Sequence, residues 1–230
     1  GFANVLDACK QYEIQEFLYA SSSSVYGSRT DAPFKETDRC DTPESFYAAT
    51  KIANEVMAQA YFAQYKTPSL GLRFFTVYGP WGRPDMSPWL FTRSILAGKP
   101  IDVFNNGNME RDFTYIDDIV QGTVLVLDRA PVPNPSYSMG KPDPSSSYAP
   151  YRILNIGHNS PVKLLHFIET LGSALDKPVN MNFLPMQKGD VVATYANIDA
   201  LHALTGYQPA VDLAEGLAQW ADWYKWYQAR

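Results

Sequence analysis

The sequence has few of the residues that build metal centres and disulfide frameworks. It holds 2 cysteines and 3 histidines among 230 residues. Cys9 and Cys40 stand too far apart in the sequence for a metal-ligand motif, and two unpaired thiols suit a reducing compartment. His158, His166 and His202 also lack the short spacing of ligand pairs. We therefore expect no metal site.

Long apolar runs and an excess of basic charge are also absent. No apolar run approaches the ~20 residues needed to span a bilayer, and residues 1–12 have the pattern of an amphipathic helix rather than of a signal peptide. The formal net charge of −5 argues against a general nucleic-acid or membrane surface. We expect a cytoplasmic protein with no membrane or nucleic-acid partner, in which a few placed arginines meet any anionic ligand.

The most informative stretch is a run of four serines, residues 21–24, and the helix that follows it. The serines come at the end of a predicted strand over 16–21. In open α/β sheets, ligands bind at the carboxyl ends of the strands. A helix predicted over 47–65 carries Tyr47 and Lys51, which are four residues apart and therefore share one face. A phenol, an ammonium and a hydroxyl are thus predicted to meet at one sheet edge.

This combination indicates a proton-transfer site. A free tyrosine titrates near ~10 and is a poor base at neutral pH. A neighbouring cation favours the phenolate, and lowering the pKa by ~3 units requires roughly 4 kcal/mol of differential stabilisation. A second Tyr-x-x-x-Lys, at Tyr137 and Lys141, lies in a Pro/Ser-rich loop without a helical pattern, and we assign it no function.

Two later segments also carry ligand-type patterns. Residues 73–84 read R-F-F-T-V-Y-G-P-W-G-R-P, in which glycine and proline end a predicted strand. Residues 111–118 read R-D-F-T-Y-I-D-D, and Phe104 stands seven positions before Arg111. On its own, Phe104 is as readily a core residue, and Arg83 is more often a solvated charge.

The serine block with Tyr47 and Lys51 resembles the Ser/Thr–Tyr–Lys triad of the extended short-chain dehydrogenase/reductases, in the NAD-dependent epimerase/dehydratase branch that acts on nucleotide sugars. The two later segments resemble signature segments of the same branch. The resemblance implies an α/β fold, with a partial Rossmann-like doubly wound sheet lacking its N-terminal half and a smaller α/β substrate-binding domain. It assigns the C-terminal half of the NAD-binding domain to residues 1–78, with 112–130 and 151–158 returning to it, and the nucleotide-sugar-binding domain to residues 79–230.

The resemblance also implies the role of each site residue. Ser22, Tyr47 and Lys51 would be catalytic. Tyr47 and Lys51 would also bind NAD, whose positively charged nicotinamide would help to acidify the phenol. Further cofactor contacts fall on Phe74 and Val77, and UDP-sugar contacts fall on Ser23, Ser24, Thr76, Arg83, Phe104, Arg111 and Asp190. Arg111 would lie on the diphosphate and Phe104 on the nucleobase, while Asp190 would take the ribose or an arginine, or be an ordinary turn residue.

The serine block also separates the reactions of this branch. Dehydratases of the branch carry an Asp-Glu pair after the catalytic Ser/Thr, and uronate decarboxylases tend to place a glutamate before Val-Tyr-Gly. Here Ser23 and Ser24 occupy those positions. Alcohols with ordinary pKa values do not serve as the acid and base of an elimination, but they can hold a C5 carboxylate in the ring plane. The resemblance therefore implies a UDP-glucuronate 4-epimerase that forms UDP-galacturonate through a 4-keto intermediate.

Three alternatives stay open. A neutral UDP-hexose 4-epimerase or a uronate decarboxylase would use the same triad. The third is a truncated, non-catalytic remnant that does not bind NAD. It arises because no G-x-x-G-x-x-G or G-x-G-x-x-G occurs in the chain, although a dinucleotide-binding fold should open with a strand and such a turn. We expect a chain that has lost its N-terminal part.

The family resemblance also suggests a homodimer through the helices at 1–12 and 45–65. The remaining elements are predicted from periodicity and breakers. They are helices over 87–98, 117–127, 160–176 and 212–227, strands over 69–75, 101–104, 152–157 and 180–184, and a hairpin-type turn at 105–108.

Overall fold

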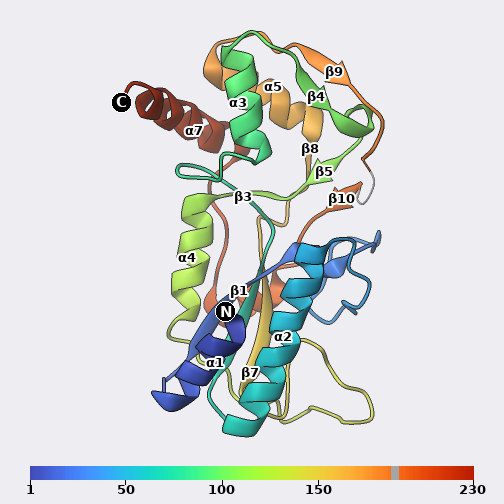
Figure 1. Ribbon diagram of the computed structural model, residues 1–230, viewed down its shortest axis with the longest axis vertical. Coiled ribbons are helices and arrows are strands. Elements are labelled where there is room, and N and C mark those ends of the chain that lie inside the picture. Colours follow the sequence, from blue (N-terminus) through green and yellow to red (C-terminus); the bar gives the residue numbers. More distant parts are fainter. Residues whose placement is uncertain (188–191) are drawn as a thin grey trace.

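A three-stranded parallel sheet forms the centre of the larger half of the molecule (Figure 1). The computed structural model describes residues 1–187 and 192–230. The strands are β1 (Phe17–Ser22), β2 (Ser69–Phe74) and β7 (Tyr151–Ile156), in the order β1-β2-β7. In this register the first residues of the three strands lie side by side, and so do their last residues. The three carboxyl ends therefore lie level at one edge of the sheet.

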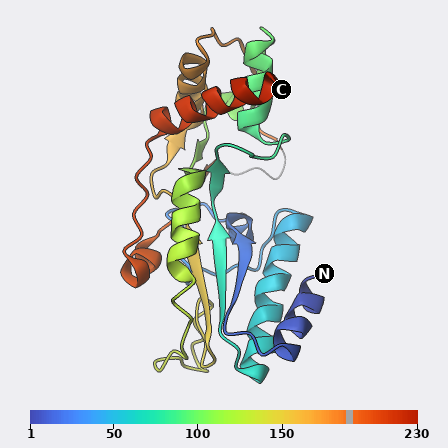
Figure 2. The same cartoon turned by 90° about the vertical axis from the view of Figure 1, so that its left-hand side faces the viewer.

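Helices cover both faces of this sheet (Figure 2). On one face lie α1 (Phe2–Gln11) and α2 (Phe46–Tyr65). On the other lie α4 (Ile116–Val126) and α6 (Asp199–Thr205). A parallel sheet with helices on both faces is the doubly wound arrangement, so the predicted α/β fold class is confirmed.

Each face of the sheet buries its own apolar cluster. Fully burying one leucine or phenylalanine side chain contributes roughly 1.5–3 kcal/mol, so these clusters dominate the stability of the larger half. Under α1 and α2 the buried side chains include Leu6, Tyr19, Phe62, Tyr151 and Ile153. On the opposite face they include Leu70, Leu72, Val126, Leu154, Ile156 and Leu201.

The smaller half is built from helices packed against a short parallel sheet (Figure 1). The helices are α3 (Ser87–Leu96), α5 (Leu164–Leu175) and α7 (Leu213–Gln228). β4 (Ile101–Val103) pairs in parallel with β9 (Met181–Phe183). Their common core contains Phe113, Phe167, Leu171, Leu217 and Trp220, and the Trp220 indole donates to Thr92 Oγ1 at 2.8 Å.

Short strand pairs join the two halves. β3 (Thr76–Tyr78) pairs in parallel with β6 (Phe113–Tyr115). β5 (Glu110–Arg111) lies between the parallel β10 (Ala193–Thr194) and the antiparallel β8 (Val162–Lys163). Because the chain crosses between the halves several times, the region between them is held from several directions.

Asp112 ties three of these crossing segments together. Its carboxylate is fully buried and accepts hydrogen bonds from the backbone N–H groups of His158 at 2.8 Å, Asn159 at 3.1 Å and Ala196 at 2.9 Å. Burial raises the pKa of this carboxyl, and the three backbone bonds partly offset that effect. One side chain thus joins the end of β7 and the segment after β10 to the start of β6.

Ser45 determines where α2 begins. Its Oγ accepts a hydrogen bond from the Ala48 N–H at 3.1 Å and so caps the first turn of the helix. The helix ends at Lys66, which adopts a left-handed conformation with φ of 61°. This start places Tyr47 in the first turn and Lys51 in the next, both toward the carboxyl edge of the sheet.

The predicted hairpin at 105–108 is wrong. The segment forms a 3₁₀ turn over Phe104–Gly107, and β4 before it pairs with the distant β9 rather than with the next strand. Asn105 and Asn106 both have φ of 50°, which asparagine tolerates better than most residues. The Asn-Gly signal correctly marks a tight turn, but tertiary pairing decides which strands flank it.

Two predicted helix starts are also wrong. α5 begins at Leu164 rather than at Ser160, because the residues before it pair with β5 as strand β8. α4 begins at Ile116, so that Asp117 lies in its first turn and not at the cap. A negative charge in the first turn still favours the positive end of the helix dipole.

We predict that Asp112→Asn lowers the free energy of unfolding by about 2 kcal/mol, because an amide keeps one acceptor oxygen but turns a donor toward buried N–H groups. Urea unfolding followed by circular dichroism measures the change. Asp117→Asn, at an exposed position in the next helix, is the control and should cost less than about 1 kcal/mol. Equal losses in both variants would contradict the role given to Asp112.

Candidate active site

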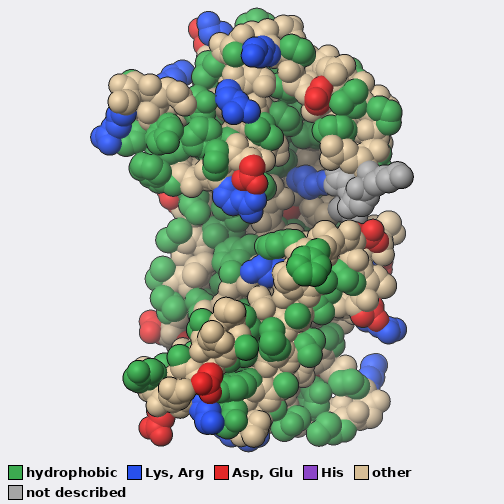
Figure 3. Space-filling model, in the orientation of Figure 1, with side chains coloured by type: hydrophobic (Ala, Val, Ile, Leu, Met, Phe, Trp, Pro, Cys, Tyr) green, Lys and Arg blue, Asp and Glu red, His purple; other side chains and the backbone are tan. Residues whose placement is uncertain are grey.

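A cleft of about 730 Å³ lies at the carboxyl edge of the sheet. Its walls come from the end of β1, the first turns of α2 and the segment that follows β2. Figure 3 shows the surface hollowed between the two halves, with basic side chains at the hollow. The lining includes the predicted site residues Ser22, Ser23, Tyr47, Lys51, Phe74, Thr76, Val77 and Arg83. The level strand ends thus bring together residues from β1, the 3₁₀ turn after it, α2, β2 and the segment that follows β2.

Ser22 is the last residue of β1 and caps the 3₁₀ turn Ser23–Tyr26. Its Oγ accepts hydrogen bonds from the Ser24 N–H at 3.2 Å and from the Ser24 hydroxyl at 2.9 Å. A hydroxyl oxygen has two acceptor lone pairs, so these two bonds leave the Ser22 O–H as a donor to a third group. In this structure Ser24 therefore donates to Ser22 through both its backbone N–H and its hydroxyl.

Tyr47 and Lys51 lie on the same face of α2. Tyr47 is half exposed, at 51%, and the Lys51 Nζ lies 5.7 Å from the centre of its ring. The same ammonium donates to the Ala20 carbonyl at 3.0 Å, two residues before Ser22. That bond holds Lys51 against the end of β1. The phenol, the ammonium and the serine hydroxyl thus border one cleft.

Arg83 and Asp85 form an exposed pair at the mouth of this cleft. Arg83 donates to the two carboxylate oxygens of Asp85 at 3.1 and 2.5 Å. Hydrogen bonding to Asp85 raises the pKa of Arg83, and the bonds from Arg83 lower the pKa of Asp85. Solvent screens an exposed ion pair of this kind and makes it weak, so an anionic ligand can compete for this arginine.

A second cleft, of about 390 Å³, adjoins the first and shares Thr76 and Met86 with it. Phe104 and Arg111 both line this second cleft. Arg111 lies at the end of β5 and donates to the carbonyls of Glu110 at 2.9 Å and Val192 at 3.1 Å. An aromatic face and a guanidinium in one cleft suit a nucleobase and a phosphate group. Asp190 lies outside the described residues.

Other predicted and observed features lie away from these two clefts. Tyr137 packs on Tyr148, with ring centres 5.8 Å apart. Neither Tyr137 nor Lys141 is among the described residues that line the two clefts. Among residues 1–187 and 192–230, no three histidine, cysteine or acidic side chains are grouped so that they could hold a metal ion. In the same part of the chain no helix is long and apolar enough to cross a bilayer.

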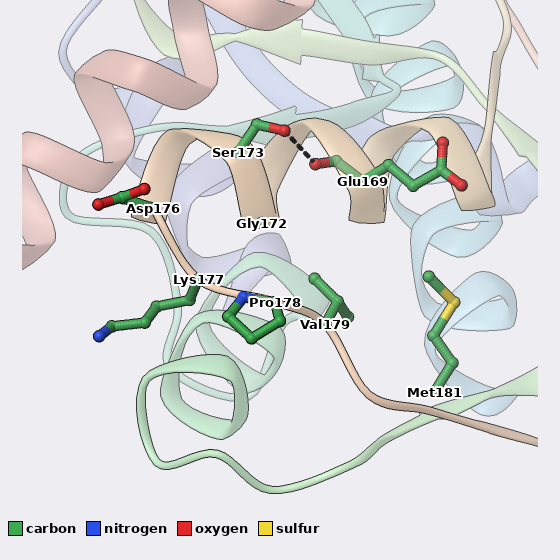
Figure 4. Close-up of a pocket in the computed structure, with 8 residues that line it drawn as sticks. All are labelled: Glu169, Gly172, Ser173, Asp176, Lys177, Pro178, Val179 and Met181. Carbon is green, nitrogen blue, oxygen red and sulfur yellow. Dashed lines mark hydrogen bonds between the residues drawn. The ribbon is translucent and has the colours of Figure 1, made fainter.

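A third hollow, of about 490 Å³, lies on the outer surface where α5 ends (Figure 4). Glu169, Asp176 and Lys177 supply its charged groups, and the Ser173 hydroxyl donates to the Glu169 carbonyl at 3.0 Å. Its described lining contains none of the predicted site residues. The two adjoining clefts are therefore the better candidate for the site.

Sequence reasoning missed a buried ion pair behind the first cleft. Arg73, in β2, donates to both carboxylate oxygens of Glu55, in α2, at 2.9 and 2.8 Å. Burial alone would lower the pKa of the Arg73 guanidinium, but its bonds to Glu55 raise it. The available signal was an arginine inside an otherwise apolar strand, which a buried partner must neutralise.

Comparison with known proteins identifies relatives of this chain. The sequence profile of the NAD dependent epimerase/dehydratase family matches residues 1–140. Protein CapI of Staphylococcus aureus is 49% identical over 224 residues, which cover 97% of this chain and 67% of that protein. A probable UDP-glucuronate 4-epimerase of Rhizobium meliloti is 45% identical over 225 residues, covering 97% of this chain and 66% of that protein.

Solved structures give the same result. The UDP-glucuronic acid 4-epimerase from Bacillus cereus, in complex with UDP-glucuronic acid and NAD, superposes with a TM-score of 0.83 at 32% identity, covering 98% of this chain and 66% of that one. The chain thus spans about two thirds of the length of these relatives. The sequence match and the shared fold together show that the chain belongs to the NAD dependent epimerase/dehydratase family.

Proposed function

We propose that this chain carries out the inversion of C4 in UDP-glucuronate, forming UDP-galacturonate through a 4-keto intermediate with NAD as cofactor. The observation that carries the proposal is the convergence of Ser22, Tyr47 and Lys51 in one cleft that adjoins the cleft of Phe104 and Arg111. Similarity to proteins named UDP-glucuronate 4-epimerase supports the choice of substrate.

Tyr47 is the proposed general base. Its phenolate takes the proton of the C4 hydroxyl, directly or through Ser22, and returns it when the 4-keto sugar is reduced. The ammonium of Lys51 lies 5.7 Å from the centre of the ring, so it can attract the negative charge that Tyr47 carries when it acts as the base. Because Ser22 already accepts two bonds from Ser24, its own proton is available to the reacting oxygen or to Tyr47.

The residues of the first cleft fit the nicotinamide end of NAD. Phe74 and Val77 offer apolar wall beside Tyr47 and Lys51. An ammonium has three N–H donors, so the bond from Lys51 to the Ala20 carbonyl still permits bonds to a cofactor ribose. When bound, NAD supplies the hydride acceptor and donor for C4.

The second cleft is proposed to bind UDP. Arg111 would pair with the diphosphate, for which a planar guanidinium is suited, and Phe104 would stack on the uracil. Ser23 and Thr76, which line the first cleft, would hold the C5 carboxylate, and Ser24 would join them by turning its hydroxyl away from Ser22. Arg83 would leave Asp85 to cover the sugar. Asp190, outside the described residues, remains a proposed ribose contact on the basis of the sequence alone.

The direct test is to incubate the purified chain with NAD⁺ and UDP-glucuronate and to identify the sugar product by NMR. UDP-galacturonate is the expected product. UDP-xylose or a 4-keto pentose would identify a decarboxylase instead. No turnover, together with no protection against thermal unfolding by millimolar NAD⁺, would identify the non-catalytic remnant and overturn the proposal.

We predict that Tyr47→Phe lowers kcat by about 10²- to 10⁴-fold, because it removes the proton acceptor and keeps the ring. The KM for UDP-glucuronate should change little, since the UDP contacts lie in the other cleft. Tyr137→Phe, which changes the second Tyr-x-x-x-Lys copy, is the matched control and should keep the original kcat. A Tyr47→Phe enzyme with more than about a tenth of the original kcat would rule out this base.

We predict that Ser23→Ala/Ser24→Ala releases a decarboxylated product. A 4-keto uronic acid loses CO₂ when its carboxylate turns perpendicular to the ring, and the two hydroxyls are proposed to prevent that rotation. Product analysis by mass spectrometry measures the ratio of pentose to hexuronate. Ser28→Ala, an exposed serine of the same loop, should give only the epimer. Clean epimerisation by the double variant would argue against the carboxylate-holding role.

We also propose a homodimer through α1 and α2, whose outer surface exposes Val5, Val56 and Met57. Figure 3 shows many apolar side chains on this face, and such patches often mark interfaces. We predict that Val56→Lys shifts the protein toward monomer in sedimentation-velocity experiments. Val120→Lys, at an equally exposed valine on α4 across the sheet, should leave the association unchanged. Identical sedimentation of both variants and the wild type would place the interface elsewhere.

A further inference from the structure

A buried ion pair lies directly behind the proposed catalytic residues. Glu55 is 7% exposed and Arg73 is 1% exposed. The guanidinium meets the carboxylate in bidentate geometry, with Nε to Oε1 at 2.9 Å and Nη2 to Oε2 at 2.8 Å. Glu55 stands four residues after Lys51 and eight after Tyr47, so all three share one face of α2.

The pair is the centre of a wider network that reaches every strand of the main sheet. The Ser21 hydroxyl, next to Ser22 in β1, donates to Glu55 Oε1 at 2.5 Å. Arg73 also donates to the Tyr26 hydroxyl at 3.1 Å, and Tyr26 donates to Asn155 Oδ1 in β7 at 2.6 Å. One turn of α2 is thereby joined by directional bonds to β1, β2 and β7.

Stability does not explain why charges occupy this position. Removing an ion pair from water costs several kcal/mol per ion, and apolar residues of similar volume are often as stabilising or more so. The rest of the buried face of α2 consists of Ala48, Ala58 and Phe62. Contacts of this kind are non-directional, so they resist separation of the helix from the sheet better than they resist sliding.

Sliding of α2 matters because the catalytic groups sit on different elements. Tyr47 and Lys51 move with the helix, whereas Ser22 stays with β1. A misplacement of about 1 Å between reacting groups can cost about 10²-fold in rate. The bond from Lys51 to the Ala20 carbonyl, at 3.0 Å, depends on the same register, but it is made by a long, flexible side chain.

We propose that the Glu55–Arg73 pair, with Ser21, is a positioning device that sets the register of α2 against β1, so that Tyr47 and Lys51 meet Ser22. Glu55 and Arg73 act through the helix and do not touch substrate or cofactor. The catalytic part of this inference rests on the proposed epimerase function, whereas the register of the helix does not.

The decisive variant is Glu55→Leu/Arg73→Met, which replaces both charges by apolar side chains. We expect it to fold, since both members of the bonded pair are removed together and the nearby buried carboxylate of Glu36 keeps its hydrogen bond from the Asn155 N–H at 2.9 Å. We also expect it to lower kcat by about tenfold or more. The KM for UDP-glucuronate should stay within about twofold, because Phe104 and Arg111 do not move with α2.

Asp118→Asn is the matched control. Asp118 is also a buried carboxylate, and it accepts from the N–H groups of Ala210 and Val211 at 3.0 Å each. It lies on α4, across the sheet from α2 (Figure 2). This variant should lower Tm and leave the kcat per folded molecule and the KM for UDP-glucuronate unchanged. Glu55→Gln, which keeps the side-chain length and one acceptor oxygen, should recover part of the lost kcat.

A crystal structure of the double variant tests the register without any activity. We expect α2 to be displaced along β1, with Lys51 Nζ no longer within 3.0 Å of the Ala20 carbonyl. An unchanged helix position overturns the inference, as does an unchanged kcat per folded molecule when the wild type turns over. If the wild type does not turn over, the proposed function is overturned but the inference about the helix register is not. The position of α2 in the double variant then tests that inference. If the double variant does not fold, the same two measurements on Glu55→Gln decide.

Discussion

The candidate site depends on the level alignment of three parallel strands. Because β1, β2 and β7 begin and end together, their carboxyl ends form one edge on which the serine run, the segment after β2 and the first turns of α2 meet. Backbone hydrogen bonds join the strands, and the pattern of their side chains sets the alignment, since a shift of one residue would turn every side chain of a strand to the opposite face. The apolar clusters on both faces then make any other register costly.

Two different kinds of force place the groups on that edge. Apolar burial holds the helices to the sheet, but it has no preferred direction along the helix axis. Directional bonds supply the missing precision. The Ser45 cap determines where α2 begins, Glu55 and Arg73 join it to the strands, and the Lys51 ammonium reaches the end of β1. The polar groups near the cleft therefore serve geometry more than stability.

The strand pairs that join the two halves provide the residues of the second cleft. The crossings at β3, β5 and β6 bring Thr76 and Arg111 from segments far apart in the sequence into adjoining clefts. Asp112 holds these crossings with three backbone hydrogen bonds. A ligand with a nucleotide at one end and a reacting sugar at the other suits such a pair of clefts, because each end can be gripped by a different set of residues.

Local patterns in the sequence determined the elements of the parallel sheet, the position of α2, the carboxyl-edge location of the serines and the pairing of Tyr47 with Lys51. These follow from periods of 2 and 3.6 residues and from caps, which act over a few residues. The sequence could not show that the turn at 105–108 joins β4 to the distant β9, that the residues before α5 form a strand, or that Glu55 meets Arg73. Only the tertiary structure decided these, because strand pairing and the neutralisation of a buried charge depend on partners that lie far away along the chain.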